Sequence, residues 1–316
     1  MKFFFRLLLG VLAFVAGCRQ APPRGPQLDF FDVAPDDRRV IFNWVENDIS
    51  SIEELDMETG QRRSVFHGEP HISYFRPSYS TDGQRIAFIR TVAQDRRGHV
   101  CIADHDGSNM DTLARNVGIV TEVLMSASGE QVFFITAREF TNYSPLARKA
   151  PHKFDLYAVE ISTKKVWQLT HVDAYAVSNL SRLGSDRLVF RLDDGDMRGL
   201  YSLNVDRHGQ SPQPFPTPQN VGLSDDLFYG AEASARWNKI LYRAPADLFV
   251  ANPDGSGAKR PTAIDDRGQF RAAKWFSQTE SVLYSCTGSR DLFLVDPTGD
   301  RHQRLRLFPR ATTPSE

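Results

Sequence analysis

The feature of this sequence that most constrains its fold is a pattern that recurs about every 46 residues from Leu28 onward. A turn-forming segment marks each repeat. The intervals between successive markers are 47, 56, 46, 46 and 44 residues, and the markers are Gly60, Gly107, Thr163, Gly209, Gly255 and Gly299. A fixed period of this length is typical of chains built from repeated supersecondary units.

Each repeat also contains a short run of β-branched and aromatic residues, as strands prefer. These runs occupy 40–42, 86–88, 132–134, 188–190, 240–242 and 282–284. Tight turns precede several of them, with Asp-Gly at 82–83 and Ser-Gly at 128–129, pairs that supply the positive φ of hairpin turns. No long stretch shows a helical period.

Repeats of about 40–50 residues with several short strands are typical of propeller blades. One such sheet cannot bury both of its faces, whereas radial stacking buries them all. We therefore predict an all-β, six-bladed β-propeller of four-stranded antiparallel blades over 28–309. The expected blades are 28–68, 69–117, 118–171, 172–218, 219–264 and 265–309.

The first 18 residues have the pattern of an export signal. Lys2 and Arg6 precede an apolar run over 7–15, which is too short to span a bilayer as a stable helix. The run ends in Val15-Ala16-Gly17-Cys18, which resembles the bacterial lipobox. That resemblance implies cleavage before Cys18 and lipidation of its thiol. The alternatives are an ordinary secretory signal with a chance cysteine, or a retained membrane anchor.

The segment 19–27 is rich in proline and glycine, with Pro22, Pro23, Gly25 and Pro26, and is predicted to be an extended linker. No aspartate follows Cys18, which favours the outer membrane, facing the periplasm, as the final location. The last residues, 310–316, are predicted to be a flexible tail. The two remaining cysteines, Cys101 and Cys286, lie in apolar strand-like runs and are expected to be buried free thiols.

Composition and motifs exclude several functions. With 38 basic and 39 acidic residues the formal net charge is −1, so no global field favours nucleic acid. The sequence contains no Gly-x-Ser-x-Gly elbow, phosphate loop, His-Glu-x-x-His motif or Cys-x-x-Cys pair. We therefore predict no cofactor and favour a non-catalytic role.

One segment of the second repeat resembles a known family. The run 76–88, Arg-Pro-Ser-Tyr-Ser-Thr-Asp-Gly-Gln-Arg-Ile-Ala-Phe, is similar to the Pro-Asp-Gly repeat of TolB-like, WD40-like propellers. The segments 102–109 and 248–256 resemble the strand and turn that follow it. The resemblance implies a TolB-like β-propeller in the cell envelope; TolB proteins carry a further α/β domain before the propeller, for which this chain has no room.

The longest insertion is predicted to be a loop over 137–153, on the rim shared by the blade connections. A long loop on a rigid scaffold is a common recognition site, although a solvated insertion without a ligand has the same pattern. Arg96 and Arg97 are expected on the same rim. The candidate partner-binding residues are Arg96, Arg97, Arg138, Tyr143, Arg148, Lys149 and His152.

An acidic turn in the fourth repeat is a weak metal candidate. Asp193, Asp194 and Asp196 could bind calcium, but their spacing does not match an EF-hand loop. The chemistry of a tight hairpin explains the same residues, so no metal is predicted.

Two functions remain open. The first is a lipid-anchored module that binds an envelope protein or peptide; the second is a propeller hydrolase or lyase acting on glycans or lactones in the central channel. A purely structural accessory subunit is a third possibility. Three or more channel-facing carboxylates or histidines around a pocket would favour the enzyme. A mixed polar channel beside an exposed aromatic rim would favour binding.

The lipobox makes a direct prediction. Replacing Cys18 with serine removes the thiol that carries the acyl chains, so the protein should leave the membrane fraction and lose palmitate label in its bacterial host. Cys101→Ser is the matched control and should keep both properties. Membrane association and labelling that survive Cys18→Ser would contradict lipidation at this residue.

Overall fold

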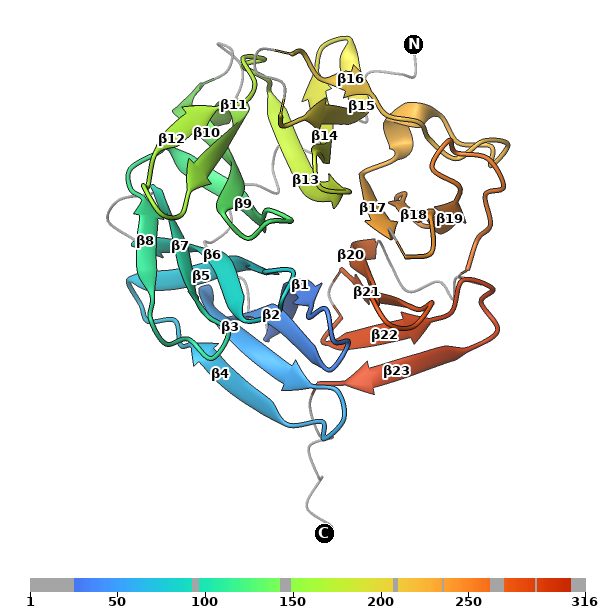
Figure 1. The fold of residues 1–316 in the computed structure, drawn as a ribbon, viewed down its shortest axis with the longest axis horizontal. Helices are drawn as coiled ribbons and strands as arrows, with labels where there is room; N and C mark the ends of the chain where they lie inside the picture. The colour runs from blue at the N-terminus through green and yellow to red at the C-terminus, as the bar shows by residue number, and fades with distance from the viewer. Residues whose placement is uncertain are drawn as a thin grey trace, which may run out of the picture.

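The computed structural model describes residues 26–307, except 93–96, 143–148, 207–209, 235, 262–269 and 288. Six antiparallel sheets stand side by side around a central axis (Figure 1). Besides strands, the described residues contain a single 3₁₀ turn, η2 (Asp225–Leu227). The predicted all-β, six-bladed propeller is confirmed.

Every blade is a meander whose strands follow sequence order from the channel outward. The first three blades are β1 (Gln27–Val33), β2 (Arg39–Glu46), β3 (Ile49–Asp56) and β4 (Arg62–Phe66); β5 (Ile72–Tyr79), β6 (Arg85–Val92), β7 (Gly98–Asp104) and β8 (Asp111–Ala114); and β9 (Ile119–Met125), β10 (Gln131–Asn142), β11 (Lys149–Glu160) and β12 (Val166–Gln168).

The last three blades repeat the arrangement. They are β13 (Ala176–Leu183), β14 (Arg187–Asp194), β15 (Met197–Asn204) and β16 (Gln213–Pro214); β17 (Gly230–Ser234), β18 (Lys239–Arg243) and β19 (Leu248–Ala251); and β20 (Phe270–Trp275), β21 (Val282–Cys286), β22 (Asp291–Val295) and β23 (His302–Arg306). Among the described residues the fifth blade has three strands, and a bridge between Val250 and Lys259 stands at its outer edge.

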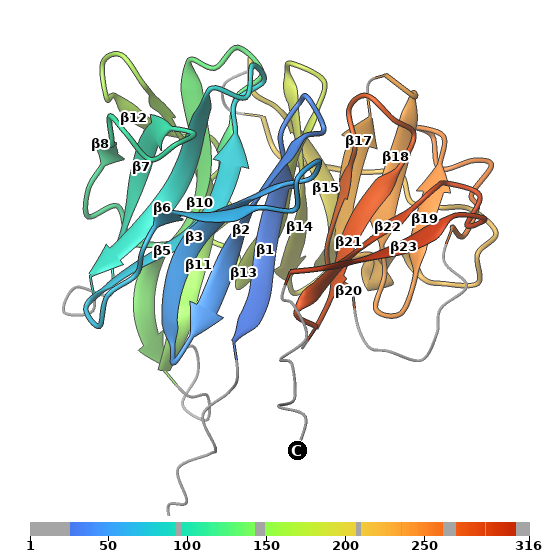
Figure 2. The same ribbon diagram turned by 90° about the horizontal axis from the view of Figure 1, so that it is seen from below.

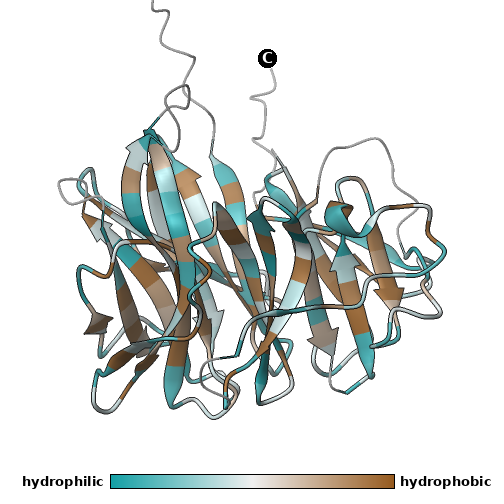
Figure 3. Cartoon of the chain, turned by 90° about the horizontal axis from the view of Figure 1, so that it is seen from above, coloured by the Kyte–Doolittle hydropathy of each residue, from teal (hydrophilic) through white to brown (hydrophobic). Residues whose placement is uncertain are grey.

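The core consists of six hydrophobic clusters, one at each contact between neighbouring blades. The second strand of a blade is buried on both faces, as shown by Val40, Ile41 and Phe42, because a neighbouring blade covers each side. Figure 3 shows the resulting hydrophobic bands along the strands. Cys101 and Cys286 are free and buried in this core, as predicted.

Among the described residues, the ring closes without exchanging a strand between its first and last blades. All of β1–β4 precede β5, and all of β20–β23 come from the end of the described chain, so each sheet is one contiguous segment. Figure 2 shows β1 standing beside this last blade. An apolar cluster that includes Phe42, Trp44, Leu283 and Leu292 fills the seam. The seam therefore depends on side-chain contacts rather than on a shared β-ladder.

Asp37 adds a polar contact to this seam. Its carboxylate accepts hydrogen bonds from the backbone N–H groups of Ser277 (2.5 Å), Gln278 (2.6 Å) and Thr279 (3.1 Å) in the last blade. Asp37 has a positive φ of 58°, and the equivalent turn position of the second blade is Gly83, with φ 68°. The first blade thus has a strained aspartate where the second has a glycine.

In the third blade, residues 137–142 and 149–153 belong to strands and not to the loop that was predicted over 137–153, and 143–148 lie outside the described residues. β10 and β11 continue as a paired hairpin in unbroken register from Gln131↔Glu160 to Asn142↔Lys149. Cross-strand pairs such as Glu139↔His152 and Phe140↔Pro151 extend the ladder beyond the blade. We use the name insertion rim for the end of the propeller that carries Asn142 and Lys149 of this hairpin, Tyr175 and Met197.

Replacing Asp37 with glycine should lower the free energy of unfolding by about 1–3 kcal/mol, since hydrogen bonds to a charged group are lost. Glycine adopts the positive φ without the strain that Asp37 carries, so the relief of this strain offsets part of the loss. Asp106→Ala is the control, because that carboxylate bonds only within its own turn, to Ser108. Urea denaturation measures both, and an equal loss would contradict a role in closure.

Candidate functional site

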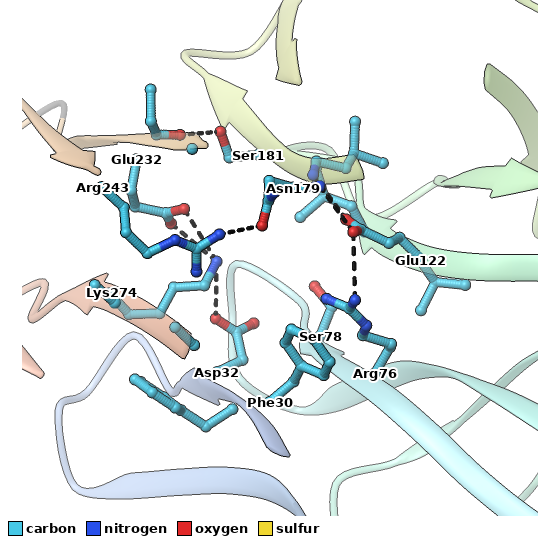
Figure 4. A pocket seen from close by; sticks show the side chains of 18 of the residues that line it. Phe30, Asp32, Arg76, Ser78, Glu122, Asn179, Ser181, Glu232, Arg243 and Lys274 are labelled. Atoms are coloured by element: carbon cyan, nitrogen blue, oxygen red, sulfur yellow. Dashed lines mark hydrogen bonds and ion pairs between the residues drawn. The ribbon is translucent and has the colours of Figure 1, made fainter. Parts of the chain in front are cut away.

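A cavity opens in the central channel, and the innermost strands of all six blades line it (Figure 4). It leaves about 100 Å³ for the centres of water-sized molecules, whereas one water needs about 10–15 Å³. The cavity can therefore hold several waters or one small polar group. Its labelled lining residues are Phe30, Asp32, Arg76, Ser78, Glu122, Asn179, Ser181, Glu232, Arg243 and Lys274.

One strand position recurs in this lining. In each blade, this position is held by the residue of the innermost strand that pairs, across the β-ladder, with the middle residue of the apolar run in the second strand. The six residues are Asp32, Ser78, Leu124, Ser181, Glu232 and Lys274, opposite Ile41, Ala87, Phe133, Val189, Leu241 and Leu283. Because the blades repeat the same register, these side chains form one layer around the channel.

This layer joins each blade to the next. Asp32 accepts the N–H of Tyr79 (2.9 Å), and the Ser78 hydroxyl accepts the N–H of Met125 (3.3 Å). Ser181 donates to the carbonyl of Ala231. The Lys274 ammonium donates to both Glu232 oxygens (3.1 Å each) and lies 3.6 Å from Asp32.

The third blade departs from this pattern, because Leu124 cannot make a polar contact. Glu122, two residues earlier, makes it instead. Its two carboxylate oxygens accept the N–H groups of Asn179 and Leu180, each at 2.7 Å, and Arg76 lies 3.5 Å away. Glu122 is only 5% exposed, so these bonds replace the hydration that burial removes. Polar contacts thus run around the whole ring.

A second layer lies nearer the insertion rim, where β-bulges interrupt the inner strands. The pairing of β5 shifts between Phe75 and Ser78, and that of β13 shifts between Ser178 and Ser181. The bulged residues Arg76 and Asn179 have positive φ values of 53° and 58°. Bulges next to a site re-aim side chains, and these two turn Arg76 and Asn179 into the cavity.

Arg243 completes the second layer from an unexpected element. It ends β18, the second strand of the fifth blade, and reaches past Gly230 of the inner strand. A Cβ at Gly230 would lie 3.3 Å from the Arg243 Nη2 atom. The missing side chain therefore makes room for the guanidinium group.

Among the described residues, the guanidinium of Arg243 bonds to neutral oxygens. It donates to the backbone carbonyl of Arg271 and to the side-chain oxygen of Asn179. Its Nε is buried without a hydrogen-bond partner among the described residues. Burial lowers the pKa of Arg243 to about 10, and Arg76 and Arg271 add repulsion, although Glu122 opposes the change.

The carboxylates that face the cavity form hydrogen bonds or ion pairs within the protein. Burial raises the pKa of Glu232, and Lys274 opposes that shift. Burial alone would lower the pKa of Lys274, but Glu232 and Asp32 raise it overall. Three carboxylates do line the cavity, which was our criterion for an enzyme, yet they serve as contacts between blades. Across the described chain, no group of three or more His, Cys, Asp or Glu side chains is arranged to hold a metal ion.

The predicted partner-binding residues lie outside this cavity. Arg138 pairs with Asp155 (3.6 Å) and Asp173, a contact between the third blade and the segment that leads to the fourth. His152 is buried and bonds to Glu139 (3.2 Å) within the hairpin. Lys149 lies over the Phe140 ring, 5.1 Å from its centroid.

The remaining predicted residues divide into two groups. Cys18, Arg96, Tyr143 and Arg148 lie outside the described residues, whereas Arg97 is exposed. In the acidic turn, Asp193 pairs with Arg198 (3.0 Å) and Asp194 accepts the N–H of Tyr175 (3.2 Å). Asp193 thus bonds within its own hairpin, and Asp194 bonds to the start of the inner strand of the same blade.

Sequence reasoning missed the channel residues, although part of their signal was present. Asp32, Ser78 and Ser181 each stand eight or nine residues before the centre of a predicted strand, so the repeat register could have aligned them. Arg243 carried no such signal, because it belongs to a second strand and enters the channel only through the gap at Gly230.

No family model and no curated protein sequence matches the chain. Its fold is nevertheless similar to solved structures. TolB from Acinetobacter baumannii has a TM-score of 0.63 at 12% identity; the match covers 86% of this chain and 64% of that one. The chain thus spans less than two thirds of that TolB.

Two further structures are similar. The β-propeller domain of the Trilobed protease from Pyrococcus furiosus, which has an open velcro topology, gives a TM-score of 0.57 at 12% identity, covering 90% of this chain and 97% of that one. An oligogalacturonate lyase from Vibrio parahaemolyticus gives 0.57 at 12%, covering 90% and 80%. At these identities the likeness concerns the fold.

The fold and its channel define a TolB-like six-bladed β-propeller, as the sequence predicted. Its blade order runs from one end of the described chain to the other, with every sheet contiguous. In the residues that the structure describes, no helix has the length and apolar character to cross a membrane.

Replacing Glu122 with glutamine should lower the free energy of unfolding by about 1–3 kcal/mol, because an amide offers one acceptor where two buried N–H groups need one each. Glu130→Gln is the isosteric control in an exposed turn of the same blade and should have little effect. Thermal and urea unfolding measure both. A negligible effect of Glu122→Gln would contradict its role as a contact between blades.

Proposed function

We propose that this chain is a lipid-anchored, periplasm-facing binding module of the bacterial cell envelope, which binds a protein or peptide at the channel mouth on the insertion rim. The proposal rests on how the charged groups of the cavity are paired. Its carboxylates are held by neighbouring blades, while a cavity with an incompletely paired cationic group remains open to a partner.

The surroundings of the mouth support this function. Tyr175 and Met197 are exposed by 46% and 37%, and both flank Asp194 at the insertion rim. Exposed apolar side chains beside a polar pocket are typical of binding surfaces. The β10–β11 hairpin extends the same rim, with the Lys149 ammonium over the Phe140 ring.

The proposed anchor would keep this rim close to the membrane. β1 begins at Gln27 on the insertion rim, nine residues after Cys18. Nine residues reach at most about 30 Å when fully extended. The partner is therefore expected near the same membrane surface.

Catalysis on glycans or lactones is the second candidate. Glu232 favours it, because burial raises the pKa of this carboxyl group and a buried acid with a raised pKa is a common catalytic feature. Lys274 donates to both of its oxygens, however, which leaves Glu232 poorly placed to exchange a proton with a substrate. Turnover of a glycan or lactone that Glu232→Gln abolishes would establish this alternative.

Site-specific crosslinking in intact cells tests the binding proposal. A photoreactive phenylalanine analogue replaces Tyr175 on the insertion rim, and the same analogue replaces Met110, which is equally exposed at 44% on the opposite rim. We expect a discrete crosslinked protein from position 175 and none from position 110. Identical products from both positions, or none from position 175, would argue against partner binding at this rim.

A further inference from the structure

We propose that Arg243, with Arg76 and the ring of Phe30, forms an anion subsite in the channel that takes one carboxylate of a peptide partner. This inference rests on the proposed function and adds the chemistry of recognition. It begins with the charges that surround the cavity, because a partly buried cation without a close counter-charge can take one from a ligand.

The acidic groups around the channel each have cationic partners other than Arg243. Asp29 bonds to Arg271, and Glu122 is near Arg76. Asp32 and Glu232 share the ammonium of Lys274, and the Arg182 guanidinium adds a favourable charge near Glu232.

Arg243 takes no part in these pairs. Among the described residues, no carboxylate oxygen lies within 4.0 Å of its guanidinium, and its polar partners are the Arg271 carbonyl and the Asn179 amide oxygen. Of the charged side chains that line the cavity, three are cationic and three are carboxylates, and Arg76 and Lys274 each have a carboxylate within 4.0 Å. A carboxylate of a partner would give Arg243 the same kind of contact, and the planar fork of arginine matches that group geometrically.

Phe30 provides the apolar part of the subsite. The guanidinium groups of Arg76 and Arg271 both lie over its ring, and the Arg271 group is 4.5 Å from the ring centroid. The lining adds Leu180, Leu241 and Ala272. A lining that combines apolar and charged side chains fits a peptide carboxylate better than a hydrated inorganic anion, since an organic carboxylate brings its own apolar neighbours.

The subsite also has the energetic signature of a functional group. Burial disfavours the charge of Arg243, Glu122 and Glu232 attract it, and Arg76 and Arg271 repel it, so that its pKa is lowered overall. Neutralising it should therefore leave the stability of the free protein unchanged or higher. A structural arginine would behave in the opposite way, because its loss would remove a needed contact.

The test uses the full-length protein in detergent and isothermal titration calorimetry. The probes are acetyl-Ala-Ala-Phe as the free acid, the same peptide as its amide, acetyl-Ala-Glu-Phe-amide, and inorganic phosphate. We expect the free acid, the side-chain acid or both to bind, the amide to bind at least tenfold more weakly, and Arg243→Gln to reduce acid binding at least tenfold. The two acid peptides distinguish a C-terminal from a side-chain carboxylate.

Arg198→Gln is the control, because Arg198 is an exposed arginine on the same rim, paired with Asp193 outside the cavity; it should bind like the wild type. Without ligand, Arg243→Gln should unfold at the same or a higher temperature than the wild type. A saturating acid peptide should raise the unfolding temperature of the wild type but not of Arg243→Gln.

Several outcomes would overturn the subsite. They are equal binding of acid and amide by the wild type, unchanged acid binding by Arg243→Gln, a marked loss of stability in Arg243→Gln, or binding of phosphate alone. The comparison of acid with amide needs only the wild type, so it stands even if a variant folds poorly. Crosslinks from position 175 without peptide binding would refute the subsite and leave the proposed function intact.

Discussion

The structure depends on the contact between neighbouring blades, because no single four-stranded sheet of this size can bury both of its faces. Six apolar clusters supply most of that burial, one at each blade junction. The junction between the last and first blades has the same character as the others, since no strand crosses it. Closure of the ring is therefore a matter of side-chain packing and of contacts such as those of Asp37.

The polar layer inside the channel follows from the same constraint. Inner strands converge on the axis, so their polar side chains face one another in a narrow space and must find partners there. Asp32, Ser78 and Glu122 do so by accepting backbone N–H groups of the next blade. The carboxylates are thus used to assemble the ring. Arg243 differs because it joins the channel from a second strand and meets only neutral oxygens.

Much of the fold could be predicted from the sequence, and little of the site. The turn markers and apolar runs fixed the number of blades, their approximate limits and the buried state of Cys101 and Cys286. The paired residues 137–142 and 149–153 were mistaken for parts of a loop, since a sequence of polar residues does not reveal cross-strand pairing. Arg138 and His152 were expected to bind a partner, yet the structure shows them paired within the fold, a result of neighbours distant in sequence.

The sequence by itself determined the class of this protein, because strand propensity, turn chemistry and the repeat period are local properties that each blade carries independently. The predicted lipid anchor at Cys18 belongs to the same kind of local signal. Only the tertiary structure decided which charges share the channel. That outcome depends on bulges at Arg76 and Asn179 and on the gap at Gly230, which place side chains from six separate segments within one small volume. The strength of a contact between two charged groups depends on the distance between them. The distances between groups on different blades are set only when the ring closes.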